Sequence, residues 1–456
     1  MEFIQQPYQP GETIAAIATP PGEGGVAIIR ISGKQAIDVG EKVFSSPLRK
    51  HPSHTVHYGK IKNHFGEIID SVLLAPFYAP RSYTGEDTVE IYCHGGSLIT
   101  RRVLEVVLKA GARAALPGEF TFKAFINGKV DLAQAEAVQD LISAKNERAL
   151  EAAEKQLEGA LSHQVEFLQN KLTTIAAILE AWVDFPDEGL EFTSMEEIVG
   201  ELEEIKQQVQ RYIASFHEGK ILHEGLSLSL IGAPNVGKSS LMNLLLNKER
   251  AIVSPIPGTT RDILEDHLRL SGLNFRLLDT AGIRETQESI EQEGIRRSLA
   301  AMQEADLILV ILDVQHQDII PEFLDLIPRE KAILVWNKCD LTHNALPTYG
   351  FSHHVVISAL KKLGIETLKK EIETIIWKNG PPSKDEIIIT NVRHKEALQE
   401  AEKMLSCLIE GLQSGISPEF LTLEARGILY ALGKILGTDI SEDILNAIFS
   451  KFCIGK

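Results

Sequence analysis

The stretch 232–240, GAPNVGKSS, decides the fold of the middle of the chain. It fits the pattern G-x-x-x-x-G-K-[ST], with Gly232, Gly237, Lys238 and Ser239 at the fixed positions. The apolar run LSLSLI precedes it and the helical SLMNLLLN follows it, which is the strand, loop and helix order of a phosphate-binding loop. Glycines let the backbone N–H groups of such a loop surround phosphate oxygens at a helix start. We therefore predict that Lys238 reaches the β- and γ-phosphates and that Ser239 ligates Mg²⁺.

A second motif predicts which base is bound. NKCD, residues 337–340, follows the apolar run AILVW. The Asp340 carboxylate can accept hydrogen bonds from the N1–H and amino group of guanine, and adenine lacks this pair of donors. SAL, residues 358–360, follows another short apolar run and is expected to complete the base pocket through its backbone. These patterns favour GTP over ATP.

Two further segments complete the expected nucleotide site. DTAG, residues 279–282, should place Asp279 beside Mg²⁺ and the Gly282 N–H against the γ-phosphate. PGTTRD carries Thr259 and Thr260, one of which should close over the metal, since such segments order and disorder with hydrolysis. The predicted GTP-contacting residues are Asn235, Val236, Gly237, Lys238, Ser239, Ser240, Ser254, Pro255, Ile256, Pro257, Gly258, Thr259, Thr260, Asp279, Thr280, Ala281, Gly282, Asn337, Lys338, Asp340, Ser358, Ala359 and Leu360.

Together these four motifs resemble those of the translation-factor-related small GTPases, with one departure. Signalling GTPases orient the attacking water with a glutamine after the DTAG glycine, and Ile283 stands at that position here. Another residue must hold the water, or hydrolysis is negligible. The spacing leaves open whether a following carboxylate does so or whether these carboxylates form a solvated helix face. The candidates are Glu285, Glu288, Glu291 and Glu293.

The composition is that of an ordinary soluble protein, with 44% hydrophobic and 24% charged residues in 456. No stretch approaches the roughly 18 consecutive apolar residues that span a bilayer, and the start lacks the pattern of a signal peptide, so we expect a cytoplasmic protein with no membrane contact. Four scattered cysteines suggest neither a disulfide framework nor a zinc site. A net charge of −17 argues against a protein that coats nucleic acid by itself.

The patterning predicts a multidomain chain of α/β and all-helical parts. Residues 1–118 contain short strands separated by turns, and 119–220 are helical, with a long amphipathic helix or a pair of helices across 150–179. Residues 221–379 alternate strands and helices, which indicates a mostly parallel sheet covered on both faces. Residues 380–456 are helical again. The two helical segments are expected to form one domain, with the α/β unit inserted at a surface loop.

One helix is predicted in detail within the N-terminal part. SLITRRVLEVVLKAGA, residues 97–112, has helical periodicity. We expect Leu98, Val103, Val106 and Val107 to lie close to one apolar stripe facing the core.

The ends of the chain make a resemblance specific. ATPPGEGGVAIIRISG, YTGEDTVEIYCHGG, PGEFTFKAFINGKVDLAQAEAVQDLI, the GTPase motifs and a terminal Cys-x-Gly-Lys together resemble the MnmE (TrmE) family of tRNA modification GTPases, over the whole chain. The resemblance implies an N-terminal domain that binds tetrahydrofolate and dimerises, a discontinuous helical domain and an inserted Ras-like GTPase domain.

The resemblance also implies the reaction and the partners. An FAD-dependent partner of the MnmG type joins the homodimer, as a heterotetramer, and tRNA binds through the complex. The product is an aminomethyl or carboxymethylaminomethyl group at C5 of the wobble uridine. The one-carbon unit comes from 5-formyl- or 5,10-methylene-tetrahydrofolate. An acidic chain suits this arrangement, because the partner can carry much of the RNA binding.

Four positions match the family's folate-binding residues: Arg30, Glu90, Lys129 and Lys456. A carboxylate can pair with the N–H donors of the pterin ring, and cations suit the acidic tail of folate. Without the resemblance, the first three read as strand-end or surface charges.

The resemblance assigns the water-positioning role to Glu291 and places a K⁺ ion where other GTPases use an arginine finger. The ion promotes pairing of the GTPase domains across the dimer, and its charge stabilises the transition state. The K⁺ ligands implied are Asn235, Ser254, Ile256 and Thr259, and the Mg²⁺ ligands are Ser239 and Thr260. Arg261 and Arg284 are expected either to stabilise the closed pair or to lie in solvent.

The terminal CIGK matches the family's C-terminal motif, which implies a tail folded toward the folate site. Cys453 is then either a nucleophile or proton donor, beside a lysine that could lower its pKa, or a structural residue. We also consider two other functions. One is a switch GTPase of the ribosome-assembly kind, and the other is a folate-dependent one-carbon transferase regulated by GTP.

Overall fold

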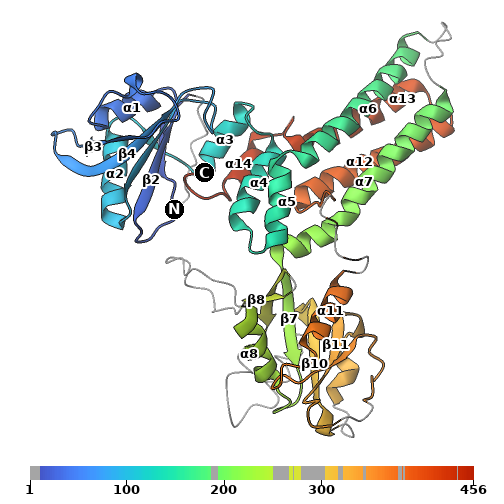
Figure 1. The fold of residues 1–456 in the computed structure, drawn as a ribbon. Helices are drawn as coiled ribbons and strands as arrows, with labels where there is room; N and C mark the ends of the chain where they lie inside the picture. The colour runs from blue at the N-terminus through green and yellow to red at the C-terminus, as the bar shows by residue number, and fades with distance from the viewer. Residues whose placement is uncertain are drawn as a thin grey trace.

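The computed structural model describes residues 11–185, 194–249, 267–270, 272–278, 303–316, 322–342, 346–377, 380, 383, 386–438 and 440–456. Figure 1 shows a sheet with two helices at the N-terminal end, a group of long helices, and a second sheet that follows directly from the end of a long helix. The predicted combination of α/β and helical parts is confirmed.

The N-terminal part is built on a six-stranded sheet of order β3-β4-β5-β2-β1-β6, in which only the β1–β6 pair is parallel. Its elements are β1 Ile14–Ile17, β2 Val26–Ser32, α1 Ala36–Val43, β3 His57–Lys62, β4 Ile68–Phe77, β5 Thr88–His94, α2 Ser97–Lys109 and β6 Arg113–Ala114. Alternate side chains such as Ile29, Ile31 and Ile91 are fully buried in the core shared with α1 and α2. The intervening Arg30 and Glu90 therefore lie on the opposite face of the sheet.

One detail of the α2 prediction is wrong. Val103 and Val107 are fully buried, as expected, but Leu98 is 63% exposed. The buried stripe runs through Thr100, Val103 and Val107. Leu98 precedes Val103 by five residues, which turns its side chain by about 140° around the helix axis. It therefore points away from the sheet.

The helical part comes from two segments of the chain. The helices are α3 Glu119–Ile126, α4 Leu132–Ser143, α5 Glu147–Leu157, α6 Ala160–Asp184, α7 Met195–Glu224, α12 Val392–Gln413, α13 Pro418–Leu436 and α14 Glu442–Phe449. The apolar repeat across 150–179 is a pair of helices, α5 and α6. They are separated at Gly159, whose φ of 89° lies in the left-handed region that glycine tolerates.

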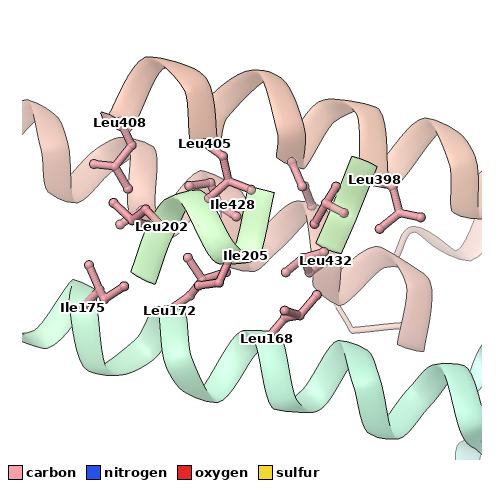
Figure 2. Close-up of a cluster of buried hydrophobic side chains, with 14 of the residues drawn as sticks. Leu168, Leu172, Ile175, Leu202, Ile205, Leu398, Leu405, Leu408, Ile428 and Leu432 are labelled. Carbon is pink, nitrogen blue, oxygen red and sulfur yellow. The ribbon is translucent and has the colours of Figure 1, made fainter. Parts of the chain in front are cut away.

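Helices α6, α7, α12 and α13 share one hydrophobic core, shown in Figure 2. Leu172, Leu202, Leu405 and Ile428, one from each helix, are all fully buried in it. Since α12 and α13 follow the second sheet in the chain, this core confirms the predicted discontinuous helical domain. Neither segment buries its apolar stripe alone.

The inserted part is a second six-stranded sheet of order β12-β11-β10-β7-β9-β8. Its elements are β7 Leu226–Ile231, α8 Lys238–Glu249, β8 His267–Leu270, β9 Leu273–Leu278, β10 Leu307–Asp313, β11 Ala332–Asn337, β12 His354–Val356 and α11 Ile365–Ile376. All pairs are parallel except β8–β9. Along β10, Leu309 and Ile311 join one apolar cluster and Ile308 and Val310 join another, so both faces are covered, as predicted.

The two connections to the inserted sheet lie side by side. Ser215 on α7 accepts a hydrogen bond from the Ile389 N–H at 3.1 Å, and a Cβ on Gly219 would lie 2.0 Å from the Ile389 carbonyl oxygen. Helix α7 continues to Glu224, and its Leu222 packs in the core of the inserted sheet. The segment that enters the inserted sheet, α7, and the segment that leaves it, at Ile389, are thus held together at the junction.

Candidate functional sites

The loop between β7 and α8 has the form of a phosphate cradle. Asn235 and Gly237 have φ angles of 62° and 101°. A Cβ at Gly237 would lie 2.2 Å from the Asn337 amide nitrogen, so only glycine fits there. The Lys238 ammonium donates to the carbonyls of Gly232 at 2.6 Å and Ala233 at 2.9 Å, which holds it over the loop.

Asn337 connects three parts of the predicted nucleotide site. Its side chain is 2% exposed, donates to the Val236 carbonyl at 2.8 Å and accepts from the Ala359 N–H at 3.0 Å. It therefore ties the phosphate loop and the segment 358–360 to the end of β11. These segments meet at the carboxyl edge of a parallel sheet, where such sheets bind ligands.

The neighbouring Lys338 has a partner that the sequence reasoning missed. Its φ is 68°, and its ammonium pairs with Asp313 at 2.6 Å. Asp313 is 6% exposed and ends β10, the strand next to β11. The sequence contains one sign of this ion pair, because the apolar run ADLILVILD ends in the carboxylate of Asp313.

Asp340 has the charge state that guanine recognition requires. A hydrogen bond from the Ser358 hydroxyl lowers the pKa of the Asp340 carboxyl, so this group is ionised at neutral pH and can only accept hydrogen bonds. Ser358 is fully buried, whereas Leu360 is 80% exposed. The Cys339 N–H bonds to the Ile357 carbonyl at 3.0 Å, which seats this turn on the end of β12.

Many of the predicted nucleotide and cation residues lie outside the described residues. They are Ser254, Pro255, Ile256, Pro257, Gly258, Thr259, Thr260, Asp279, Thr280, Ala281, Gly282, Ile283 and Glu291, with Arg261, Arg284, Glu285, Glu288 and Glu293. Of the predicted K⁺ and Mg²⁺ ligands, Asn235 and Ser239 are described. Within the described part of the chain, histidine, cysteine and acidic side chains do not gather in groups of three that could hold a metal.

A second site lies on the open face of the N-terminal sheet. Arg30 on β2 is directly opposite Glu90 on β5, and its Nε donates to Glu90 Oε1 at 2.9 Å. Arg30 Nη1 also donates to the carbonyl of Gly455 at 3.2 Å. Two predicted folate residues and the C-terminal tail are therefore brought together, although Arg30 and Gly455 are 425 residues apart.

The tail is held in place by its backbone and by one aromatic side chain. Phe452 is 6% exposed and packs with Phe449. The Phe120 N–H donates to the Lys456 carbonyl at 3.1 Å, and a Cβ on Gly455 would lie 2.5 Å from the Ile17 carbonyl oxygen. Burial, together with Arg30, lowers the pKa of the Lys456 side chain. Cys453 is exposed beside this site.

Three aromatic residues of this site were missed in the sequence. The Arg30 guanidinium lies over the rings of Tyr83 and Phe120, with its Cζ 5.6 and 5.7 Å from their centroids. The Tyr92 hydroxyl donates to Glu90 Oε2 at 2.7 Å. The only signal for Tyr92 was its position two residues after Glu90, which places both side chains on one face of a strand.

Lys129 is placed differently from the other predicted folate residues. Its ammonium donates to the Pro80 carbonyl at 3.2 Å. Among the described residues, no hydrogen bond or ion pair joins Lys129 to Arg30, Glu90 or Lys456. It lies beside the loop that carries Tyr83, since a Cβ on Gly85 would lie 3.3 Å from the Cγ of Lys129.

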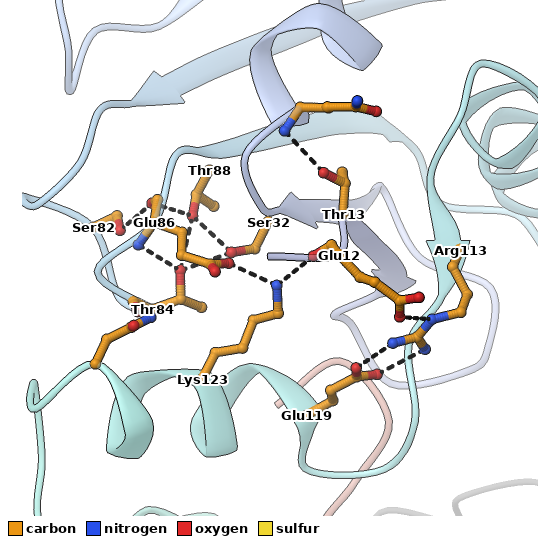
Figure 3. A network of polar contacts seen from close by, with 12 residues as sticks. Glu12, Thr13, Ser32, Ser82, Thr84, Glu86, Thr88, Arg113, Glu119 and Lys123 are labelled. Atoms are coloured by element: carbon orange, nitrogen blue, oxygen red, sulfur yellow. Dashed lines mark hydrogen bonds and ion pairs between the residues drawn. The ribbon is translucent and has the colours of Figure 1, made fainter. Parts of the chain in front are cut away.

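Helix α3 is fixed against the sheet by the buried polar network in Figure 3. Lys123 is fully buried and contacts Glu86 Oε2 and the Glu12 carbonyl, both at 2.6 Å. Arg113 pairs with Glu119 at 2.5 Å and with Glu12 at 2.7 Å. The network sets the helix that carries Phe120 against the loop that carries Tyr83.

Two family models match the parts of the chain that carry these two sites. The family model for the GTP-binding protein TrmE N-terminus matches residues 13–129, and that for the MnmE helical domain matches residues 132–453. No helix in the described residues has the length and apolar character to cross a membrane.

Known relatives match over all or nearly all of their length. The chain is 65% identical to the tRNA modification GTPase MnmE of Protochlamydia amoebophila (strain UWE25), over 100% of both chains. It is 45% identical to that of Moorella thermoacetica, over 98% of this chain and 99% of that protein. A solved structure, the FeoB G-domain from Methanococcus jannaschii, is 26% identical over 33% of this chain and 97% of its own, with a TM-score of 0.25. The chain belongs to the MnmE family of tRNA modification GTPases.

Proposed function

We propose that this protein is a K⁺-activated GTPase that modifies tRNA together with an FAD-dependent partner of the MnmG type. It adds an aminomethyl or carboxymethylaminomethyl group at C5 of the wobble uridine, with a tetrahydrofolate as one-carbon donor. The observation that carries the proposal is that one chain of this family holds both a phosphate loop joined by Asn337 to the NKCD segment and a separate Arg30–Glu90 site closed by the C-terminal tail.

At the nucleotide site, each predicted residue is given one role in the proposal. Lys238 binds the β- and γ-phosphates, Asp340 selects guanine and Ser239 helps to hold Mg²⁺ with Thr260. Asn235, Ser254, Ile256 and Thr259 are the proposed K⁺ ligands. When bound, the two cations offset the negative charge that develops on the phosphate oxygens. Glu291 orients the water, which Ile283 cannot do.

The second site fits a folate by the chemistry of its side chains. Glu90 is a carboxylate able to accept N–H donors of a pterin ring, and Arg30 and Lys456 are cations suited to an acidic tail. Their side chains are sheltered, with 16% of Arg30 and 15% of Glu90 exposed, so that water competes weakly. When bound, 5-formyl- or 5,10-methylene-tetrahydrofolate supplies the one-carbon unit. Lys129 completes the proposed set.

We propose a homodimer formed through the N-terminal sheet. Tyr58, Leu73 and Val26 are 71%, 45% and 60% exposed on the face that α1 and α2 do not cover. A second copy would bury this apolar surface. The partner protein then joins as a heterotetramer and contributes most of the tRNA contacts, since this chain carries a net charge of −17.

The decisive experiment is mass analysis of tRNA nucleosides from cells lacking this protein. The modified wobble uridine should disappear and return when the gene is restored. Unchanged nucleosides would exclude the proposed reaction and leave the ribosome-assembly switch as the better reading.

Cation dependence tests the hydrolysis mechanism separately. GTP hydrolysis should be fast in K⁺ buffer and slow in Na⁺ buffer, and Glu291→Gln should remove most of the K⁺-dependent rate. Equal rates in both buffers would contradict K⁺ activation without affecting the folate site.

The role of Cys453 can be tested separately from GTP hydrolysis. We expect Cys453→Ser to abolish tRNA modification while hydrolysis stays intact, because the thiol is exposed beside the folate site and far along the chain from the phosphate loop. Normal modification with the serine variant would assign Cys453 a structural role only.

A further inference from the structure

Tyr92 stands next to the carboxylate that the proposed folate site depends on. Glu90 and Tyr92 are two residues apart on β5, so their side chains leave the sheet on the same face. Tyr92 is opposite Leu73 of β4 and Ile28 of β2, in the middle of the sheet. Its backbone is held by strands on both sides, which makes it a rigid support.

The contacts of Glu90 leave a defined part of its carboxylate free for a ligand. An ionised carboxylate has about four lone-pair sites, two on each oxygen. Arg30 Nε occupies one on Oε1 at 2.9 Å, and the Tyr92 hydroxyl occupies one on Oε2 at 2.7 Å. Because the two partners bind different oxygens, they fix the plane of the carboxylate. The described residues make no other hydrogen bond to it, so one acceptor position remains on each oxygen.

Tyr92 can hold this position throughout the physiological pH range. Burial and the neighbouring carboxylate raise the pKa of Tyr92 to about 12, so the phenol keeps its proton and can only donate it to Glu90. A tyrosine that ionised would repel the carboxylate instead.

We propose that Tyr92 is a positioning residue, which turns the Glu90 carboxylate so that both oxygens face a flat heterocycle with two neighbouring N–H donors. This inference rests on the proposed function, in which the pterin ring of a tetrahydrofolate is that heterocycle. Tyr92 acts through Glu90 and need not touch the ligand.

The test is a double-mutant cycle on the full-length chain, with 5-formyl-tetrahydrofolate as the probe and calorimetry as the readout. Tyr92→Phe removes one oxygen atom and should weaken binding about tenfold, the usual effect of losing a hydrogen bond to a charged group. Tyr430→Phe is the matched control, since Tyr430 lies 48% exposed on helix α13 of the helical part. It should bind like the wild type, and both variants should keep the thermal transition and the GTPase rate of the wild type.

A second comparison, made in the Glu90→Gln background, separates a positioning role of Tyr92 from other roles. If Tyr92 acts through Glu90, adding Tyr92→Phe to Glu90→Gln should have no further effect on binding. An equal loss in both backgrounds, an unchanged affinity of Tyr92→Phe, or tighter binding would each overturn the inference. If Glu90→Gln itself binds like the wild type, the proposed folate site fails and this inference fails with it. If Glu90→Gln weakens binding and Tyr92→Phe does not, only the inference fails.

Discussion

At the scale of single residues, a buried carboxylate in the helical part depends most strongly on its partners, because a buried charge is costly unless it is paired. Glu136 on α4 is 7% exposed and pairs with Arg393 at 2.7 Å and with the fully buried His394 at 2.8 Å. Burial by itself raises the pKa of Glu136, but His394 and the Arg393 guanidinium lower it to about 2, below its usual 4.5. The charged pair therefore favours the folded state whenever Glu136 is ionised.

This cluster predicts an acid sensitivity. Because the folded pKa of Glu136 lies below the unfolded value, its contribution to stability is complete above pH 4.5 and is lost as the pH falls toward about 2. Glu136→Gln should lower the free energy of unfolding at neutral pH by about 3–5 kcal/mol, the cost of breaking a buried ion pair. Urea unfolding of both proteins across this pH range measures the effect.

The control uses an exposed pair. Glu180 and Arg426 are paired at 2.7 Å but their side chains are 43% and 65% exposed, so Glu180→Gln should cost less than about 1 kcal/mol. If Glu136→Gln and wild type lost stability in parallel below pH 4.5, Glu136 could not be the group responsible.

A second residue-scale prediction concerns Asn337. Asn337→Ala leaves the Val236 carbonyl and the Ala359 N–H without their buried partner. GDP binding should weaken about tenfold to a hundredfold, as expected for unsatisfied buried groups. Fluorescent GDP titration gives the affinity, and Asn63→Ala, in an exposed turn, is the control. Wild-type affinity of Asn337→Ala would show that these two contacts do not organise the pocket.

At the scale of elements, the C-terminal tail behaves as part of the N-terminal domain. Helix α14 and the tail pack on α3 through Phe449 and Phe122, whose ring centroids are 5.2 Å apart. Gly455 then passes so close to β1 that no side chain fits, and its φ is 92°. The last turn of the chain is thereby fixed against Arg30.

Displacing the tail should affect one site only. Gly455→Ala places a Cβ 2.5 Å from the Ile17 carbonyl oxygen, which forces the tail to move. We expect tetrahydrofolate binding and tRNA modification to fall sharply while GTP hydrolysis is retained. Gly415→Ala has a comparable φ of 66° but open space around its Cβ, and it should leave both activities unchanged. Full folate affinity in Gly455→Ala would mean that the tail is not part of the site.

At the scale of the whole molecule, the GTPase part is attached to the helical part by two adjacent connections. Helix α4 contacts both of them. Asp140 pairs with His223 at 3.0 Å on the entry side and accepts from the Thr390 hydroxyl at 3.5 Å on the exit side. The pairing with Asp140 raises the pKa of His223. Helix α4, which begins shortly after Lys129, is therefore in contact with both connections of the inserted domain.

This arrangement predicts that the insertion can be removed. Replacing residues 226–386 by a short Gly/Ser linker should leave the four-helix core and the folate site folded, because Ser215 and Ile389 already touch. Circular dichroism should show helical content and a cooperative transition, folate should bind, and GTP should not. A chain without a cooperative transition would show that the helical core depends on the GTPase part. The deletion would expose Ile221 and Leu222, which pack on that part, so we expect the shortened chain to be less soluble.

The sequence predicted local features well because each depends on a few neighbouring residues. The phosphate loop requires a strand, glycines at set positions and a helix, and all are encoded within 226–249. The alternation along β2 and β5 likewise comes from a period of two. Leu98 was placed wrongly because it lies about 140° around the helix axis from Val103, and only the packing on the sheet shows how far the buried stripe extends.

What the sequence by itself determined is the series of domains, the phosphate loop, the NKCD motif that predicts guanine, and the family that its motifs resemble. Only the tertiary structure decided that Tyr83, Tyr92 and Phe120 surround the Arg30–Glu90 pair, and that Asp313 holds Lys338. The physical reason is that these contacts depend on strand pairing and on a tail docking across 425 residues of chain. Spacing in the sequence carries no record of such distances, because they are set by the packing of separate hydrophobic cores.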